Sequence, residues 1–162
     1  MGKSACATIL RHRGAAVLDA DELAHALTKP GQPALIQIQD AFGNGMLDAS
    51  GALRRSVLAD LVFSDPVALK KLESILHPKI TAAWRRQLSE WVADGRSFAV
   101  VVIPLLFETA CEGEFQTTVC VACSAGTQAE RLRLRGWAQS ETDRRLSAQL
   151  PIEQKMAAEL WR

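Results

Sequence analysis

The sequence has no stretch of apolar residues long enough to cross a membrane, and its first residues show no apolar signal segment. A spanning helix needs roughly 18 or more apolar residues in succession. We therefore expect a protein of the reducing cytoplasm that has no membrane partner.

An excess of either charge is also absent, since 19 basic residues face 18 acidic ones and the net charge is +1. Nothing global therefore attracts the protein to nucleic acid, and a small molecule is the expected partner. The arginines at 131, 133 and 135 form a local cluster that could still bind phosphate.

A zinc-binding pattern is also absent, although the sequence has four cysteines. Cys120 and Cys123 form one C-x-x-C, but no second pair or histidine completes a metal pattern. We interpret the four cysteines as buried or incidental thiols.

What is present begins at Gly2-Lys3-Ser4, the last third of the phosphate-binding loop pattern G-x-x-x-x-G-K-[ST]. In such loops the backbone N–H groups and a helix N-terminus surround the phosphates, the lysine neutralises them, and the Ser or Thr hydroxyl reaches magnesium. Residues 3–13 have helical spacing and stop at Gly14. Three residues alone are a weak signal, and an ordinary N-terminal Lys-Ser is the alternative.

Two acids follow the short apolar run AAVLD, which is typical of a parallel strand. Ligands gather at the carboxyl ends of such strands. Asp21 is placed to cap the helix ELAHAL, so Asp19 and Asp21 could simply be a helix cap and a loop acid. Alternatively, one carboxylate accepts the proton of an attacking hydroxyl or holds magnesium.

The middle of the chain is helical by pattern. Ser64-Asp65-Pro66 starts one helix that runs to His77-Pro78, and a second helix covers roughly 79–93. His77 is then either a cation at a helix end or a substrate contact. Trp84 and Trp91 are interpreted as packing residues.

Further runs are typical of two more strands, at 98–104 and 117–123, and a helix is expected from Ser124 through Leu134. A capping box at 140–143 predicts another. Strands alternating with helices, and a long helical insertion, predict a three-layer α/β fold with a parallel sheet in one domain. The strand that should precede the loop is absent from the sequence.

These stretches together resemble the dephospho-coenzyme A kinase family. The resemblance is carried, in the family's order, by GKS, VLDADELAHAL, KPGQPAL, FGNGMLDASGALRR with LVF, LHPKI, VVIPLLFE, and RLRLRG followed by RRLSAQ. GKS is shared with many kinases, whereas DAD, LHP and PLLFE in this order are specific. The resemblance spans nearly the whole chain.

The resemblance implies a phosphate-loop kinase domain over 1–162, with a helical substrate-binding insertion at about 30–95 and a lid at about 131–146. It implies phosphorylation of the ribose 3′-hydroxyl of dephospho-CoA by ATP with Mg²⁺, in a monomer or weak homo-oligomer. Lys3 and Ser4, beside Gly2, would serve the phosphates and magnesium, with Asp21 as the base. On the acceptor side the resemblance places Asp19, Arg55, His77, Pro104, Leu105 and Leu106; Arg131 and Arg135 would belong to the lid, Arg135 being the better candidate for the ATP phosphates.

The chain also departs from the family pattern, which has a first strand and G-G-I-G before the residues present here, and a strand and helix after Arg162. We interpret the chain as shortened at both ends and expect it to bind ATP poorly. Two alternatives therefore stay open. One is a nucleoside monophosphate kinase with the same core, and the other is an inactive fragment that self-associates or binds through its open sheet edge.

Overall fold

The computed structural model describes residues 2–134, 136, 142 and 149–157. These residues form two compact units, one over residues 10–102 and one that joins residues 2–9 to the chain from 103 onward. Each unit is described by itself below. None of the helices described is long and apolar enough to cross a membrane.

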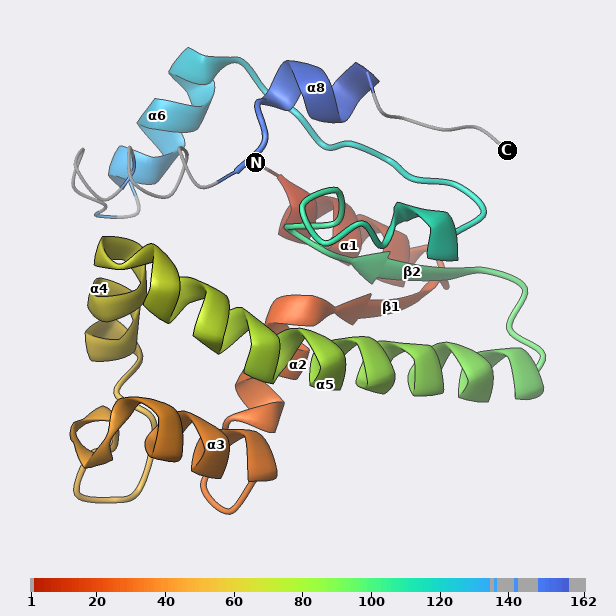
Figure 1. Ribbon diagram of the computed structural model, residues 1–162. Coiled ribbons are helices and arrows are strands. Elements are labelled where there is room, and N and C mark those ends of the chain that lie inside the picture. Colours follow the sequence, from red (N-terminus) through yellow and green to blue (C-terminus); the bar gives the residue numbers. More distant parts are fainter. Residues whose placement is uncertain (1, 135, 137–141, 143–148, 158–162) are drawn as a thin grey trace. The chain divides into compact units, whose positions relative to one another are not determined.

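Residues 10–102 contain a parallel pair of strands, β1 (Ala16–Asp19) and β2 (Ala99–Val102). The register pairs Ala16 with Ala99 and Asp19 with Val102, so both carboxyl ends lie at the same edge (Figure 1). Parallel neighbours require a long crossover connection, and here that connection is entirely helical and irregular. The two strands confirm what the apolar runs predicted.

Four helices make up the crossover. They are α2 (Ala20–Leu27), α3 (Pro33–Phe42), α4 (Arg55–Ser64) and α5 (Pro66–Ala93). Their apolar faces meet in a core of Ile38, Leu58, Val62 and Ala68, which lies between α3, α4 and α5. Trp84 of α5 is 3% exposed, as expected for a packing residue. A 3₁₀ turn (Asn44–Met46) connects α3 to the loop before α4.

Helix α5 corrects one expectation. The pattern predicted a break at His77-Pro78, but α5 continues through it, with Pro78 inside the helix. Proline lacks an N–H and normally costs about 3 kcal/mol in a helix interior. Helices α2, α3 and α4 pack against α5, which buries Ala68 before Pro78 and Trp84 after it, so packing overrides the local preference.

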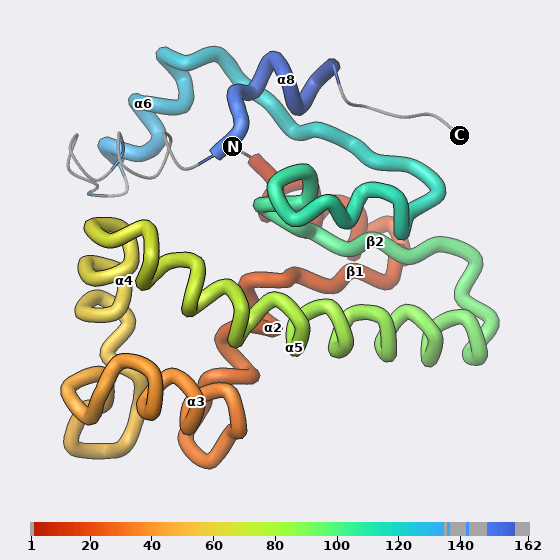
Figure 2. Tube along the Cα trace, in the orientation of Figure 1, coloured from red at the N-terminus to blue at the C-terminus, as the bar shows by residue number. Residues whose placement is uncertain are grey.

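The other unit begins with the first residues of α1 (Lys3–His12), which contributes to both units, and continues after β2. Residues 104–110 form successive turns, which Figure 2 follows in green and teal, and lead to a 3₁₀ turn at Glu112–Glu114. Helices α6 (Ala125–Leu134) and α8 (Ile152–Ala157) come next. The Ser124 hydroxyl accepts the Thr127 N–H at 3.2 Å, as a helix cap should.

The segment 117–123 was predicted to be a strand and is not one. Apart from a single bridge residue at Thr117, it has no regular pairing among the described residues. A strand exists only through its hydrogen-bonded neighbour, and the ladder of the described sheet contains β1 and β2 alone. The helix expected after the capping box at 140–143 lies outside the described residues, Thr142 excepted.

Candidate active site

Gly2, Lys3 and Ser4 form the N-terminus of α1. The Gly2 carbonyl accepts the Cys6 N–H at 2.9 Å, and Lys3 is the first helical residue. Gly2 has φ +130°, a value that L side chains rarely adopt, and a Cβ there would lie 3.4 Å from Val121 Cγ1. The helix N-terminus and a half-buried lysine therefore stand next to each other, an arrangement suited to phosphate.

Asp19 and Asp21 lie together at the start of α2. Asp19, the last residue of β1, caps the helix, because its Oδ1 accepts the Asp21 N–H at 2.9 Å. This corrects the expectation that Asp21 is the cap. Asp21 instead lies in the first turn with an exposed side chain. The pattern was ambiguous because either aspartate can precede a helix; β1 runs directly into α2 and leaves the cap to Asp19.

Arg55 is hydrogen-bonded to the C-terminal end of α2. Its Nη2 donates to the Oγ1 of Thr28 at 2.8 Å and lies 3.5 Å from the carbonyl oxygen of His25. Thr28, the C-cap of α2, is 2% exposed, and its hydroxyl donates to the carbonyl of Ala24 at 2.7 Å. The hydroxyl of Thr28 thus donates and accepts at once, which fixes the guanidinium against α2.

His77 lies in the interior of α5, where its side chain is half-buried. The interpretation of His77 as a cation at a helix end is therefore wrong, since the helix dipole acts within the terminal turns. Substrate contact stays a prediction for this residue. Helix α5 packs against α2, the helix that carries both aspartates at its start.

Residues 104–111 fold back on themselves directly after β2. The Leu105 carbonyl accepts the Thr109 hydroxyl at 2.8 Å, and the Leu106 carbonyl accepts the same hydroxyl at 3.2 Å. The N–H groups of Thr109 and Cys111 bond the same two carbonyls, at 3.0 and 3.1 Å. The backbone of the PLLFE segment is thereby held in a compact turn.

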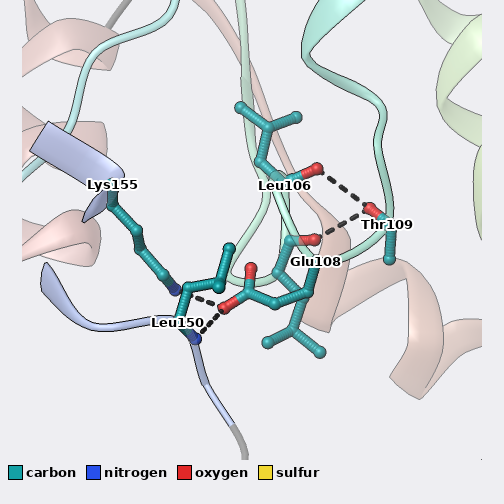
Figure 3. A network of polar contacts seen from close by, with 6 residues as sticks. Leu106, Glu108, Thr109, Leu150 and Lys155 are labelled. Atoms are coloured by element: carbon teal, nitrogen blue, oxygen red, sulfur yellow. Dashed lines mark hydrogen bonds and ion pairs between the residues drawn. The ribbon is translucent and has the colours of Figure 1, made fainter. Parts of the chain in front are cut away.

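Glu108, at the end of that segment, is the centre of a polar network (Figure 3). Its Oε1 lies 2.6 Å from Lys155 Nζ and accepts the Leu150 N–H at 3.0 Å. Partial burial is the largest single influence on the pKa of Glu108 and raises it, but Lys155 and the backbone N–H groups of Glu108 and Leu150 together outweigh burial. The pKa of Glu108 is therefore lowered below its ordinary 4.5.

Arg131 lies exposed in the last turn of α6, and Arg135 lies outside the described residues. Most of the predicted lid does too. Within the described residues, no cluster of three or more His, Cys, Asp or Glu side chains could hold a metal ion.

The described structure brings some predicted residues together and leaves others apart. Asp19 and Asp21 share one helix turn, whereas Arg55 meets α2 seven residues beyond Asp21, about 10 Å along the axis. Sequence reasoning missed Thr28, Glu108 and Lys155. Glu108 stood within a motif quoted for the resemblance, which was a signal, but neither Thr28 nor Lys155 has a pattern that predicts its partner.

Comparisons with known proteins agree over almost the full chain. The family model described as dephospho-CoA kinase matches residues 1–161. The dephospho-CoA kinase of Anaeromyxobacter dehalogenans is 43% identical over 96% of this chain and 74% of its own length. That of Bdellovibrio bacteriovorus is 40% identical over 95% of this chain and 77% of its own.

Solved structures support the same fold. The crystal structure of TT1252 from Thermus thermophilus matches with a TM-score of 0.78 and 35% identity, over 98% of this chain and 79% of that one. Dephospho-CoA kinase from Campylobacter jejuni matches in fold, with a TM-score of 0.61 and 24% identity over 96% of this chain and 78% of that one. The α/β class with a parallel sheet and the phosphate-loop kinase fold are thus confirmed, and the chain belongs to the dephospho-CoA kinase family.

Proposed function

We propose that the protein transfers the γ-phosphoryl group of ATP to the ribose 3′-hydroxyl of dephospho-CoA, giving coenzyme A and ADP. The observation that carries the proposal is the match of the dephospho-CoA kinase family model over residues 1–161. The carboxylate pair at the junction of β1 and α2 supports it, because it supplies an acid where such a fold binds its ligands.

Asp21 is the proposed base. The 3′-hydroxyl oxygen attacks the γ-phosphorus, the bond from that phosphorus to the β–γ bridging oxygen breaks, and ADP leaves with the electron pair. Asp21 accepts the hydroxyl proton, which its exposed carboxylate at a helix start can do. Asp19 is fixed by its cap hydrogen bond and so holds the turn that presents Asp21.

Positive charge stabilises the phosphates in this proposal. Lys3 and the N-terminal N–H groups of α1 would bind the β- and γ-phosphates, and Arg131 and Arg135 would neutralise charge that develops during transfer. Ser4 is exposed at the same helix N-terminus, and its hydroxyl would help to hold Mg²⁺ together with nucleotide oxygens. When bound, Mg²⁺ would supply charge neutralisation on the β- and γ-phosphates.

The acceptor side is assigned to Asp19, Arg55, His77 and the segment Pro104–Leu106. Arg55 is suited to an anionic acceptor because its guanidinium is already oriented by Thr28. We also propose one domain over 1–162 with a substrate-binding insertion at about 30–95 and a lid at about 131–146. A monomer or weak homo-oligomer in the cytoplasm completes the proposal.

The test is an acceptor assay with the purified protein, ATP and Mg²⁺. Dephospho-CoA, AMP and CMP are offered separately, and products are identified by chromatography and mass spectrometry. We expect coenzyme A to form only with dephospho-CoA. Phosphorylation of a nucleoside monophosphate without formation of any coenzyme A would contradict the proposal. A reaction without an acceptor serves as the control for ATP hydrolysis.

A further inference from the structure

The contact between Glu108 and Lys155 joins two segments that are distant in sequence and belong to the same unit. The Glu108 side chain is 17% exposed and that of Lys155 is 11% exposed. Both charges have therefore left most of their water, and such a pair persists only where the geometry is good. The separation of 2.6 Å between Nζ and Oε1 meets that condition.

The carboxylate has little other compensation. Its Oε1 receives Lys155 and the Leu150 N–H, whereas Oε2 is buried without a hydrogen-bond partner. If Lys155 lost its charge, a largely buried anion would keep only backbone donors, the N–H groups of Leu150 and of Glu108 itself. The position of Glu108 therefore depends on Lys155 more than an exposed ion pair would.

The two segments joined by this contact need it for different reasons. The described part of helix α8 has six residues, too few for a stable helix without other contacts, so tertiary contacts must help to place it. Residues 104–110 are turns that a sheet or helix ladder does not hold, and Ala110 has φ 51°, an uncommon value for a residue with a side chain. Figure 3 shows Glu108 reaching from this turn to Leu150 and Lys155.

We propose that Glu108 and Lys155 are positioning residues whose ion pair fixes the segment Pro104–Leu106 for binding of the acceptor nucleotide. The inference rests on the proposed function, which assigns that segment to the acceptor side. Neither side chain needs to touch the substrate. Glu108 acts through the turn that follows Leu106, and Lys155 acts through Glu108.

The experiment compares Lys155→Met with the wild-type protein by calorimetric titration with dephospho-CoA in the absence of ATP. Methionine keeps the length and apolar stem of lysine but removes its charge. We expect the dissociation constant for dephospho-CoA to rise roughly tenfold, as a displaced binding segment would cause, and KM for ATP to stay within about twofold. Lys155→Arg, which keeps the charge, should restore most of the affinity.

A double variant separates positioning from general damage. In Glu108→Gln/Lys155→Met the buried anion is gone and the glutamine oxygen can still accept the Leu150 N–H. The double variant should therefore bind dephospho-CoA more tightly than Lys155→Met alone. Independent roles would instead make the two losses multiply, which would overturn the inference.

Two exposed residues provide matched controls. Glu153 is an exposed residue of α8, and Lys70 is an exposed residue of α5. Glu153→Gln and Lys70→Met make the same kinds of change as the test variants, and both should leave the affinity for dephospho-CoA unchanged. A lower melting temperature with unchanged dephospho-CoA affinity in Lys155→Met would show a merely structural pair and overturn the inference. If Lys155→Met does not fold, Glu108→Gln gives the same test with a smaller expected loss. No binding by the wild-type protein would instead reject the proposed function itself.

Discussion

At the residue scale, the exposed Asp21 carboxylate gives the sharpest test of the chemistry. Asp21→Asn keeps the shape of the side chain and removes the proton acceptor, so kcat should fall about 10²- to 10⁴-fold. KM for ATP should change little. Steady-state kinetics with dephospho-CoA measure both, and unchanged turnover would remove Asp21 from the role of base.

Two neighbouring acids supply controls for that experiment. Asp19→Asn retains a good helix cap, because asparagine caps as well as aspartate, and therefore isolates the charge of Asp19 from its structural role. Glu22→Gln, in the same helical turn, removes only an exposed 3.6 Å ion pair with Arg11. We expect Glu22→Gln to behave as the wild-type protein.

The hydroxyl group of Thr28 gives a second test at the residue scale, because one oxygen atom joins α2 to Arg55. Thr28→Val keeps the volume but removes the hydroxyl that accepts from Arg55 and donates to Ala24. We expect the free energy of unfolding to fall by about 1–2 kcal/mol and KM for dephospho-CoA to rise several-fold, with KM for ATP unchanged. Thr28→Ser should recover both quantities; a failure to recover acceptor KM would mean that the hydroxyl does not place Arg55.

At the element scale, α5 is continuous although it contains Pro78, a residue that destabilises a helix interior. Pro78→Ala would restore an N–H that can bond the Ser74 carbonyl and would remove the ring, so we expect the protein to gain about 1–3 kcal/mol of stability. Thermal and urea unfolding measure this gain. Lys70→Ala, at an exposed position of α5, controls for helix propensity alone, and a loss of stability in Pro78→Ala would contradict our account of α5.

The elements also show how far sequence reasoning reaches. Strands β1 and β2 were predictable because both are short apolar runs, and β2 is also rich in β-branched valine. Helix α6 was predictable because Ser124 is a good N-cap residue. The break at Pro78 was wrong because a local rule competed with packing along α5. The strand at 117–123 was wrong because composition fits a strand but cannot supply its neighbour.

At the scale of the whole molecule, stability should depend on pH through Glu108. Its pKa is lower in the folded than in the unfolded protein, so the folded state is favoured at pH values above the ordinary 4.5. This contribution is lost as the pH falls below 4.5 toward the folded pKa. Urea unfolding between pH 7 and pH 3 should therefore show a steeper loss for the wild-type protein than for Glu108→Gln; parallel curves would contradict the lowered pKa.

The candidate site was only partly predictable, because some of its contacts join residues that are far apart in the sequence. Asp19 and Asp21 are only two positions apart in the sequence, so their shared location followed from the pattern, although the roles of cap and exposed acid were reversed. The partners of Glu108 are distant, Leu150 lying 42 residues away, and nothing in local spacing indicates such a contact. The predicted roles of Lys3, Arg55, His77 and Arg135 stay predictions.

The parallel register of β1 and β2 has a consequence for how the chain folds. It pairs Ala16 with Ala99, so a connection of about eighty residues must close before the ladder can form, and closing it costs chain entropy. The contacts around Ile38 are much more local, and we expect the helices to assemble first. Stopped-flow refolding should then show Ile38→Val slowing folding, whereas Val100→Ala mainly speeds unfolding.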